Sequence, residues 1–575
     1  MQYKETVVVL LALCAPFLVF SQTTTYLPEG ARENYLLERL EIKAGSDSIL
    51  NFSKTKPFSR RQFIPVIEKY YKAGLSSNGL NETVVDGNQS ETGKRGVKLT
   101  GVDLYNAELA LQKNSEFATG TFGSKRPVLK RFYQTPANAY EVNTEDFFLS
   151  INPVFQYTVG KEQNSSEHLF LNTRGLLLRG MIANKVGFTA YVTDNQERDP
   201  AYVRAWVNER EAVPGAGYYK NFKGTGYDYF DARGTITVNA AKYIDISFGY
   251  DKNFIGNGYR SLFLSDFSNN ALFLRLNTRI WKFNYQNLFM ELVNTQSRGA
   301  DELLNKKYAA IHHLDVGITK WLNIGLFEGI VFGRQNQFEF GYLNPVIFYR
   351  SAEQQNGSAD NALAGLDIKA NVARKFQFYG QLMLDELKIS ELRKQWWANK
   401  FGLQLGGKYI DAFGIPNLDL QAEWNRVRPF TYSHYDSVAS FAHNNQPLAH
   451  PLGASFNEVV GQLRYQFAKK WLLHATTVFY RQGRDTSRAN FGSNIFLPNR
   501  TPIRTSEYGY SIGLPVSTDV AYASFLLSYE IKPNLFFETN AVLRKQTAYA
   551  TTPERNTFVI NAGIRWNMHR REFAF

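Results

Sequence analysis

The residues of this chain that could do chemistry are few and badly spaced for catalysis. The 575 residues include eight His and one Cys. His312 and His313 are neighbours in an alternating segment, so their side chains point to opposite faces and cannot bind one metal ion. His434, His443 and His450 share one long connection without a metal-ligand spacing. The sequence therefore predicts neither a metal site nor a cofactor.

Other catalytic patterns are equally poor. No Gly-x-Ser-x-Gly elbow occurs. Gly256-Asn257-Gly258 lacks the βαβ unit that a nucleotide-binding glycine motif needs. Asp385-Glu386 and the acids Glu209 and Glu211 are charge clusters, and glycoside hydrolysis needs a carboxylate separation that sequence does not give. We expect a protein that is not an enzyme, with an enzyme as the less favoured alternative.

A basic segment at 481–504 is the better candidate for function. The chain has a formal net charge of +13, and this segment has five arginines against a single acid, Asp485, with Phe and Asn residues between them. Arginine holds carboxylates and phosphates with two hydrogen bonds, and aromatic faces stack on sugar rings. The segment is therefore a candidate contact for an acidic polysaccharide or a lipid headgroup. The alternative is a solvated loop that only covers the end of the fold or pairs with lipopolysaccharide. The arginines are Arg481, Arg484, Arg488, Arg500 and Arg504.

The elements that must position these residues alternate with a period of two. In the segment 557–567, Phe558, Ile560, Ala562, Ile564 and Trp566 share one face, and polar residues occupy most of the other. The chain then ends on Phe575. A strand with one apolar face that leads to a terminal Phe is typical of the last strand of an outer-membrane barrel.

From about residue 145 onward, such segments come in pairs. Connections within a pair are short and combine Lys with aromatics, as in Ile280-Trp281-Lys282, whereas connections between pairs are long, as at 333–361 and 428–456. Alternation alone also suits a large soluble β protein, but the asymmetry of the connections favours a barrel with short periplasmic turns and long outer loops. After the first 20 residues, no apolar run approaches the roughly 18 residues of a membrane helix. We predict an all-β transmembrane antiparallel barrel of about 18 strands.

The amino-terminal part follows a different pattern. Residues 1–21 have a basic start, an apolar stretch and small residues before Gln22, which predicts a secretory signal peptide. The only cysteine, Cys14, lies inside it, and its flanking residues disfavour lipidation. Residues 22–140 are predicted to form a small, partly helical periplasmic plug, with a helix at 32–42, a capping box at Ser59–Gln62 and a polar linker at 73–100. Residues 141–575 form the predicted barrel, with both termini periplasmic.

Three runs make a family resemblance specific. They are Lys56 to Arg60, Gly249 to Asp266, and Phe340 to Arg350 with the following Gly365-Leu366-Asp367. They resemble the signature stretches of the Wzi-type capsule-assembly family of outer-membrane barrels, nearest to the branch of the gliding-motility protein RemB. The resemblance implies an eighteen-stranded barrel, a periplasmic helical plug, and surface loops that hold capsular or other polysaccharide. In the gliding branch it implies a role in movement or adhesion, and it supplies no catalytic residues.

The sequence therefore predicts an integral protein of the Gram-negative outer membrane that binds or organises surface polysaccharide. Arg481, Arg484, Arg488 and Arg350 are the predicted polysaccharide contacts. Expected partners are surface polysaccharide, outer-membrane lipid or lipopolysaccharide, and motility or secretion proteins; nucleic acid is excluded by the compartment. The alternatives are a passive outer-membrane channel, and a motility or adhesion protein without glycan binding.

Overall fold

The structure is a computed structural model of the chain. It describes residues 22–78, 97–120, 122, 137–294, 303–346, 348–357, 360–486, 489–548 and 554–575. The predicted signal peptide with Cys14, most of the predicted linker and Arg488 lie outside these residues. The division of the chain at residues 21 and 140 stays a prediction.

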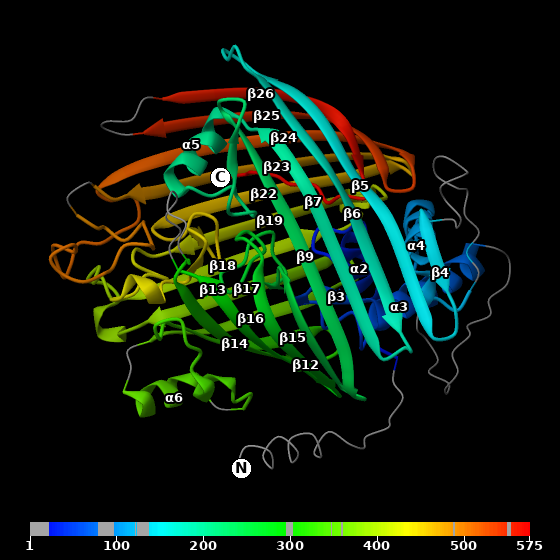
Figure 1. Cartoon of the computed structure of the whole chain (residues 1–575), viewed down its shortest axis with the longest axis horizontal. Helices are drawn as coiled ribbons and strands as arrows, with labels where there is room; N and C mark the ends of the chain where they lie inside the picture. Colours follow the sequence, from blue (N-terminus) through cyan, green and yellow to red (C-terminus); the bar gives the residue numbers. More distant parts are fainter. Residues whose placement is uncertain are drawn as a thin grey trace.

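In the described part of the chain, a closed antiparallel barrel of 18 strands forms the body of the molecule (Figure 1). Each strand pairs with its neighbour in the sequence, and β26 pairs with β5 to close the barrel. The predicted fold class and strand number are confirmed. The strands are β5 (Phe147–Glu162), β6 (His168–Ile182), β7 (Val186–Arg198), β9 (Gly226–Ala241), β10 (Ile244–Asp251), β12 (Ala271–Ile280), β13 (Phe283–Val293), β14 (Lys306–Gly317), β15 (Leu322–Phe332), β16 (Asn361–Val372), β17 (Phe376–Glu386), β18 (Lys400–Tyr409), β19 (Leu418–Val427), β22 (Phe456–Ala468), β23 (Trp471–Arg484), β24 (Val516–Lys532), β25 (Leu535–Ala548) and β26 (Arg555–Trp566).

Smaller elements join the barrel to its contents. The short strands β4 and β8 extend the barrel sheet beside β5 and β9. The others form small two-stranded sheets. The remaining elements are β1 (Tyr26–Leu27), β2 (Thr55–Lys56), β3 (Phe58–Ser59), β4 (Tyr140–Asn143), β8 (Lys220–Phe222), β11 (Phe254–Ile255), β20 (Ala442–His443), β21 (Gln446–Pro447), α2 (Arg32–Ala44), α3 (Arg60–Asn78), α4 (Gly101–Lys113), α5 (Ala201–Arg210) and α6 (Tyr349–Asn356).

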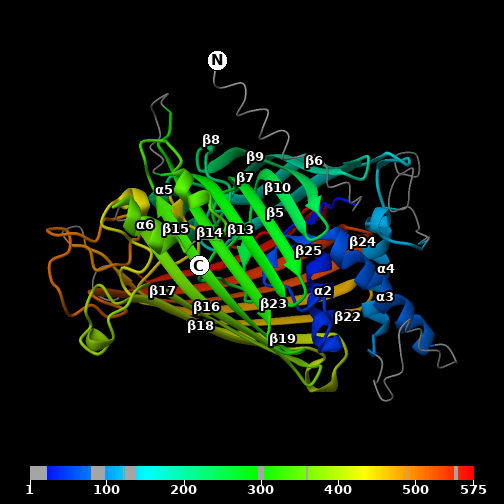
Figure 2. The same cartoon turned by 90° about the horizontal axis from the view of Figure 1, so that it is seen from below.

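The predicted asymmetry of the connections is present. One end of the barrel, the turn end, has tight turns such as the one between Ile280 and Phe283, and the other, the loop end, has the long connections (Figure 2). One turn that the alternation does not predict, at 410–417, contains a 3-10 turn and spans β18 to β19. Asp411 in this turn forms an ion pair with Arg39 of α2. The extra length of the turn therefore allows a contact with a distant part of the chain.

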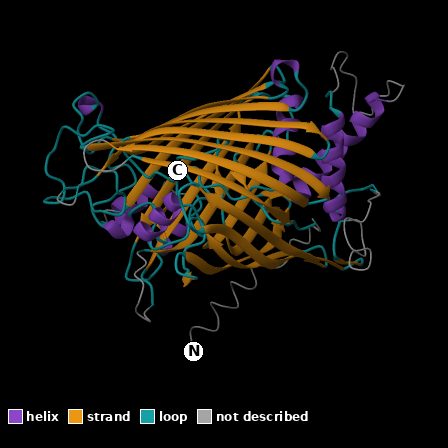
Figure 3. Ribbon diagram, turned by 90° about the horizontal axis from the view of Figure 1, so that it is seen from above, coloured by secondary structure: helices purple, strands orange, loops and turns teal. Residues whose placement is uncertain are grey.

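The helices α2, α3 and α4 lie together at the turn end, where Figure 3 shows a group of helices, and α2 contacts β16 of the wall. Arg39 of α2 joins them to the barrel, because it lies 2.9 Å from Asp103 of α4 and 2.9 Å from Asp411. Burial raises the pKa of Asp103, but the cations of Arg39 and Lys43 outweigh burial and hold this pKa well below its usual range. We call residues 22–120 the plug.

The start of α3 differs from the predicted capping box. The backbone N–H of Arg61 donates to the Thr24 hydroxyl at 3.2 Å, and the N–H of Arg60 donates to the Thr25 carbonyl at 2.9 Å. The Ser59 hydroxyl pairs with the Thr24 hydroxyl at 2.9 Å. The first helical N–H groups are thus satisfied by residues near the start of the plug.

The carboxyl-terminal residues correct the expectation for the last strand. β26 ends at Trp566, and residues 567–575 run back inside the barrel. The Phe575 ring, 6% exposed, packs against Trp206 of α5 at a centroid distance of 5.6 Å. Arg544 donates to the Phe575 carbonyl at 3.0 Å. The terminal Phe is therefore a lumen contact near the loop end, and the carboxyl end does not lie at the turn end where both termini are expected.

Long loops fill the other half of the lumen. The connection 428–455 folds inward, and its Tyr432, Phe441 and Leu448 are buried. They pack on lumen-facing apolar residues of β12 to β19 and on Leu262 and Phe263 of the connection after β10. The interior at this end is therefore a hydrophobic core built from loops.

The outer wall is apolar along its middle. Residues at alternate strand positions are exposed there, whereas their neighbours face the lumen. Among the described residues, no helix has the length and apolar character needed to cross a bilayer. The exposed wall residues include Leu176, Ile236, Phe248, Leu326, Leu366, Phe378, Leu405, Phe479, Phe525 and Ile560.

Candidate functional site

Three outer loops interlock at the loop end around two adjacent tryptophans. Trp396 and Trp397 lie in the connection between β17 and β18, and both indole N–H groups donate to one carboxylate oxygen of Glu507, at 3.3 and 2.8 Å. The Trp397 backbone N–H also donates to the Glu507 carbonyl at 3.2 Å. The loop before β24 is therefore joined to the loop before β18 at this pair of rings.

An arginine completes the join. The guanidinium of Arg504 lies 4.1 Å from the centre of the Trp397 ring and 2.7 Å from a Glu507 oxygen. Partial burial raises the pKa of Glu507, but the hydrogen bonds from Arg504 and the indoles outweigh it and lower this pKa below its usual value. The Glu507 carboxylate therefore stays charged at neutral pH and holds both rings and the cation.

The third loop supports the rings from beneath. Phe430 packs edge-on against Trp397 at 5.9 Å. Arg428 donates to the carbonyls of Trp396 and Asn399, at 3.1 and 2.7 Å. The rings are thus fixed by buried neighbours, while both remain partly exposed.

The same three loops carry further charged and aromatic residues at the loop end. Lys388 lies over Trp396 at 5.4 Å, and Arg500 lies over Tyr435 at 5.4 Å. The Tyr508 hydroxyl donates to Glu391 at 3.4 Å. We call this set the outer aromatic patch. Exposed aromatic faces beside arginine and carboxylate groups suit sugar rings, because the rings stack and the charged groups bind hydroxyls and acidic substituents. The patch comprises Lys388, Glu391, Trp396, Trp397, Tyr435, Arg500, Arg504, Glu507 and Tyr508.

The structure places the predicted arginines in several positions. Arg481 and Arg484 belong to β23 and not to a loop, which corrects the sequence interpretation. Arg481 pairs with Asp519 across the strands at 2.7 Å, on the outer wall near the loop end. Arg484 donates to the Thr518 hydroxyl at 2.9 Å. Arg488 lies outside the residues that the structure describes.

Arg350 lies elsewhere. It is in α6 on the outer face of β13 to β15, with an exposed side chain 2.7 Å from Glu353. It is not brought together with Arg481 and Arg484 on β23. The structure instead joins Arg504, at the end of the basic segment, to Trp397, and places Arg500 over Tyr435.

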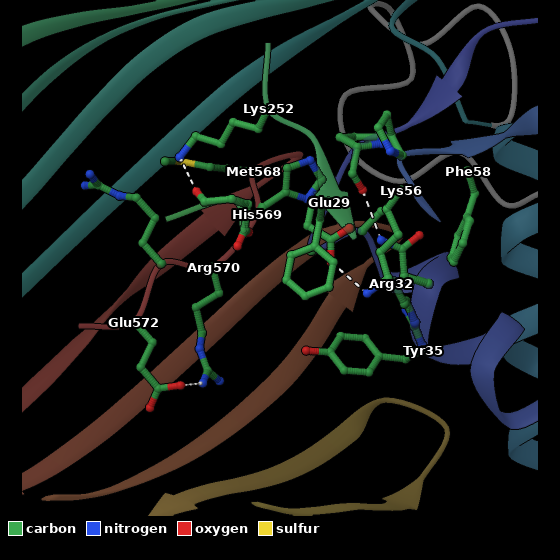
Figure 4. Close-up of a pocket in the computed structure, with 18 of the residues that line it drawn as sticks. Glu29, Arg32, Tyr35, Lys56, Phe58, Lys252, Met568, His569, Arg570 and Glu572 are labelled. Carbon is green, nitrogen blue, oxygen red and sulfur yellow. Dashed lines mark hydrogen bonds and ion pairs between the residues drawn. The ribbon is translucent and has the colours of Figure 1, made fainter. Parts of the chain in front are cut away.

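A chamber lined by several charged side chains lies deeper in the lumen (Figure 4). This cavity of about 530 Å³ has the plug on one side and the tail after β26 on the other. Lys56 lies 3.2 Å from Glu29 on the plug side, and Arg570 lies 3.2 Å from Glu572 on the tail side. Its residues are held mostly by partners within the protein, so the chamber has the character of a structural interior.

The surroundings lower the pKa of two basic side chains in the chamber. Burial and then the nearby Arg233 cation lower the pKa of Lys252 to about 8. Burial, followed by Lys113, lowers the pKa of His569 to about 3. His569 is therefore neutral at physiological pH and does not add charge to the chamber.

The prediction that His312 and His313 point to opposite faces agrees with the geometry. His313 faces the lumen and pairs with Asp367 at 2.7 Å, whereas His312 faces outward and stacks on Tyr349 at 4.0 Å. Within the described ranges, no group of three or more His, Cys, Asp or Glu side chains is arranged to hold a metal ion.

Comparisons with known proteins place this fold among outer-membrane barrels. No family model matches the chain, and no curated protein matches it. The solved structure of Wzi from Escherichia coli is similar, with a TM-score of 0.53, 13% identity, and coverage of 96% of this chain and 100% of Wzi. Wzi is described as an outer-membrane protein involved in group 1 capsule assembly and as a carbohydrate-binding β-barrel.

Two other solved barrels also match. OprD of Pseudomonas aeruginosa has a TM-score of 0.40 and 12% identity, with 72% of this chain and 94% of OprD covered. OccAB2 of Acinetobacter baumannii has a TM-score of 0.40 and 11% identity, with 73% and 97% covered. At the identity to Wzi, the likeness establishes the fold and not the activity.

Proposed function

We propose that this protein is an integral outer-membrane barrel that binds or organises surface polysaccharide and has no enzymatic role. The observation that carries the proposal is the outer aromatic patch, in which Trp396 and Trp397 are fixed by Glu507 and Arg504 at the loop end. The description of Wzi as a carbohydrate-binding barrel supports it.

Membrane placement is supported by the outer wall. Large apolar side chains are exposed at alternate positions around the strands, such as Phe248, Phe378 and Phe479. Such a surface is stable among acyl chains, and a closed barrel leaves no unpaired sheet edge in lipid. We assign the loop end to the cell surface and the turn end with the plug to the periplasm, since outer loops in such barrels are the long ones.

The proposed mechanism uses many weak contacts. The buried loop core makes the barrel a rigid scaffold, and the outer aromatic patch meets a repetitive polymer. Repetition of the sugar unit keeps the polymer attached even when each contact is weak. Arg481, Arg484, Arg488 and Arg350 stay predicted contacts, which the polymer or lipopolysaccharide would reach from the rim and the outer wall.

The channel alternative is disfavoured by the contents of the lumen. The plug, the tail at 567–575 and the connection 428–455 occupy it in series from the turn end to the loop end. A role in motility or adhesion without glycan stays a second prediction. Affinity capture from surface-labelled cells separates the two, because a glycan holder brings down polymer and a motility component brings down protein without it.

A further inference from the structure

The connection 333–360 does not extend away from the barrel as an outer loop. It turns back along the outside of the wall, so that α6 lies beside β13, β14 and β15 (Figures 1 and 2). We call its described part, residues 333–346, 348–357 and 360, the wall flap. Its Tyr342 and Tyr349 are fully buried against Phe289, Tyr308 and Ile330 of the outer face.

Specific hydrogen bonds hold the wall flap in place. The Tyr308 hydroxyl donates to the Asn336 carbonyl at 2.8 Å, and the Tyr285 hydroxyl donates to the Pro345 carbonyl at 2.7 Å. The backbone N–H of Arg350, in the first turn of α6, donates a hydrogen bond to the Glu328 carboxylate at 3.3 Å. Within the flap, Arg334 and the Tyr342 hydroxyl both bind Asp360. The flap is therefore a folded part of the wall.

The wall flap covers a polar row that a lipid-facing surface does not tolerate well. Asn287, His312 and Glu328 are paired in register across β13, β14 and β15, and all three point outward. His312 lies 3.9 Å from Glu328. Asn287 and His312 are buried, because the flap lies over them. The flap thus separates this row from the surroundings of the barrel.

The tip of the flap lies beside the apolar surface of the outer wall. Tyr285, which binds Pro345, stands in the same register row as Leu314, Leu326 and Leu366. Leu326 and Leu366 are exposed large apolar residues of the outer wall. The tip of the flap therefore borders the apolar surface of the bare wall on the neighbouring strands.

The outer side of the flap is apolar where it is most exposed. Phe340 is 78% exposed, Val346 83% and Phe348 75%. These side chains continue the belt of the adjacent wall, although the flap is a loop by sequence position. In water they would be an unfavourable patch, whereas acyl chains would bury them.

We propose that the wall flap is embedded in the outer leaflet, with Phe340, Val346 and Phe348 in contact with lipid acyl chains. The occupant is lipid, because the exposed side chains are continuous with a wall that already faces it. This inference rests on the membrane placement of the barrel under the proposed function. The flap then covers the polar row of Asn287, His312 and Glu328 and presents an apolar surface to the lipid in its place.

Site-directed spin labelling tests the proposal directly. Cys14 is the single cysteine of the chain, so single-cysteine variants are made in a Cys14→Ser background. Val346→Cys and Phe348→Cys are labelled in the full chain reconstituted in phosphatidylethanolamine and phosphatidylglycerol vesicles. Power saturation then compares accessibility to oxygen, which concentrates in lipid, with accessibility to a water-soluble nickel chelate. Phe378→Cys on the bare wall and Thr505→Cys in an outer loop are the lipid and water references.

The expected result is that labels at 346 and 348 resemble the label at 378, with oxygen favoured over nickel by several-fold, and differ from the label at 505. Nickel accessibility at 346 and 348 equal to that at 505, with 378 still in lipid, overturns the flap proposal alone. Nickel accessibility at 378 as well overturns the membrane placement and the flap proposal with it.

Discussion

The Arg504 guanidinium lies 4.1 Å from the centre of the Trp397 ring, and it is 2.7 Å from the Glu507 carboxylate that also accepts the Trp397 indole N–H. Cation, ring and carboxylate thus form one unit that joins two outer loops. Because the unit is made from loops that are far apart in the sequence, its geometry depends on the barrel beneath. This unit is the centre of the proposed polysaccharide surface.

Replacing both rings should weaken polysaccharide binding most. In the Trp396→Ala, Trp397→Ala double variant, sugar rings lose their stacking faces, and each lost aromatic contact of about 1 kcal/mol reduces affinity several-fold, with a larger loss of retention by a multivalent polymer. Retention of labelled surface polysaccharide on cells measures this. Trp281, exposed in a tight turn at the other end of the barrel, gives the matched control Trp281→Ala, which should retain polymer normally. Equal retention by both variants would refute the role of the patch.

Charge reversal at Arg481, Arg484 and Arg488 tests the predicted rim contacts. The triple variant to Glu should loosen an acidic polysaccharide, because like charges then face it, and the defect should shrink in high salt as screening increases. The comparison is a triple reversal of Lys242, Lys282 and Lys320 in the tight turns. If the barrel folds and retention is unchanged, these arginines are not part of the mechanism.

The intact protein should be silent in planar bilayers. Removal of residues 22–120 should produce only small or brief conductance, because the connection 428–455 still fills the loop end with buried side chains. Single-channel recording of both forms measures this. Large, steady conductance from the full chain would support the passive-channel alternative instead.

Acid should release the plug. The pKa values of Asp103 and Asp411 are lowered from an ordinary value of 3.8, since Arg39 and Lys43 outweigh the effect of burial. Their contribution to stability is therefore present above pH 3.8 and is lost as the pH falls below it. The anisotropy of a fluorophore at Glu108→Cys in α4 should stay constant down to about pH 4, fall as the pH is lowered from there to about pH 2, and recover on neutralisation.

The Asp103→Asn variant gives the same loss without acid. It removes one carboxylate partner from Arg39 and Lys43, which keep Asp411, and breaking a buried pair costs about 3–5 kcal/mol. Its fluorophore should already be mobile at pH 7. An anisotropy that is constant from pH 7 to about pH 2 in the natural chain would show that these pairs do not hold the plug.

Much of the barrel follows from local pattern. Alternation in segments such as 272–280 fixes which face of a strand is apolar, and the difference between tight and long connections fixes which end is which. The spacing of apolar residues at 32–42 likewise predicts the first helix of the plug, which extends to Ala44. These features depend on neighbours within a few residues, so the sequence displays them.

The features that the sequence did not display depend on distant contacts. Phe575 lies in the lumen, where its ring packs against Trp206 and its carbonyl accepts a hydrogen bond from Arg544. The run at 340–350 reads as an outer loop, but the outer faces of β13 to β15 hold it against the wall. The adjacent Trp396 and Trp397 are the one local signal of the outer aromatic patch, and their contacts with Arg504 and Glu507 come from a loop far along the chain.

Binding of acidic surface polysaccharide to the purified, folded barrel in lipid nanodiscs tests the central claim most directly. Biolayer interferometry with immobilised polymer should show salt-sensitive binding by the natural chain, normal binding by Trp281→Ala, and at least a tenfold loss by the Trp396→Ala, Trp397→Ala variant. Failure of the natural chain to bind any polymer from its own cell surface, or undiminished binding by the double variant, would contradict the account.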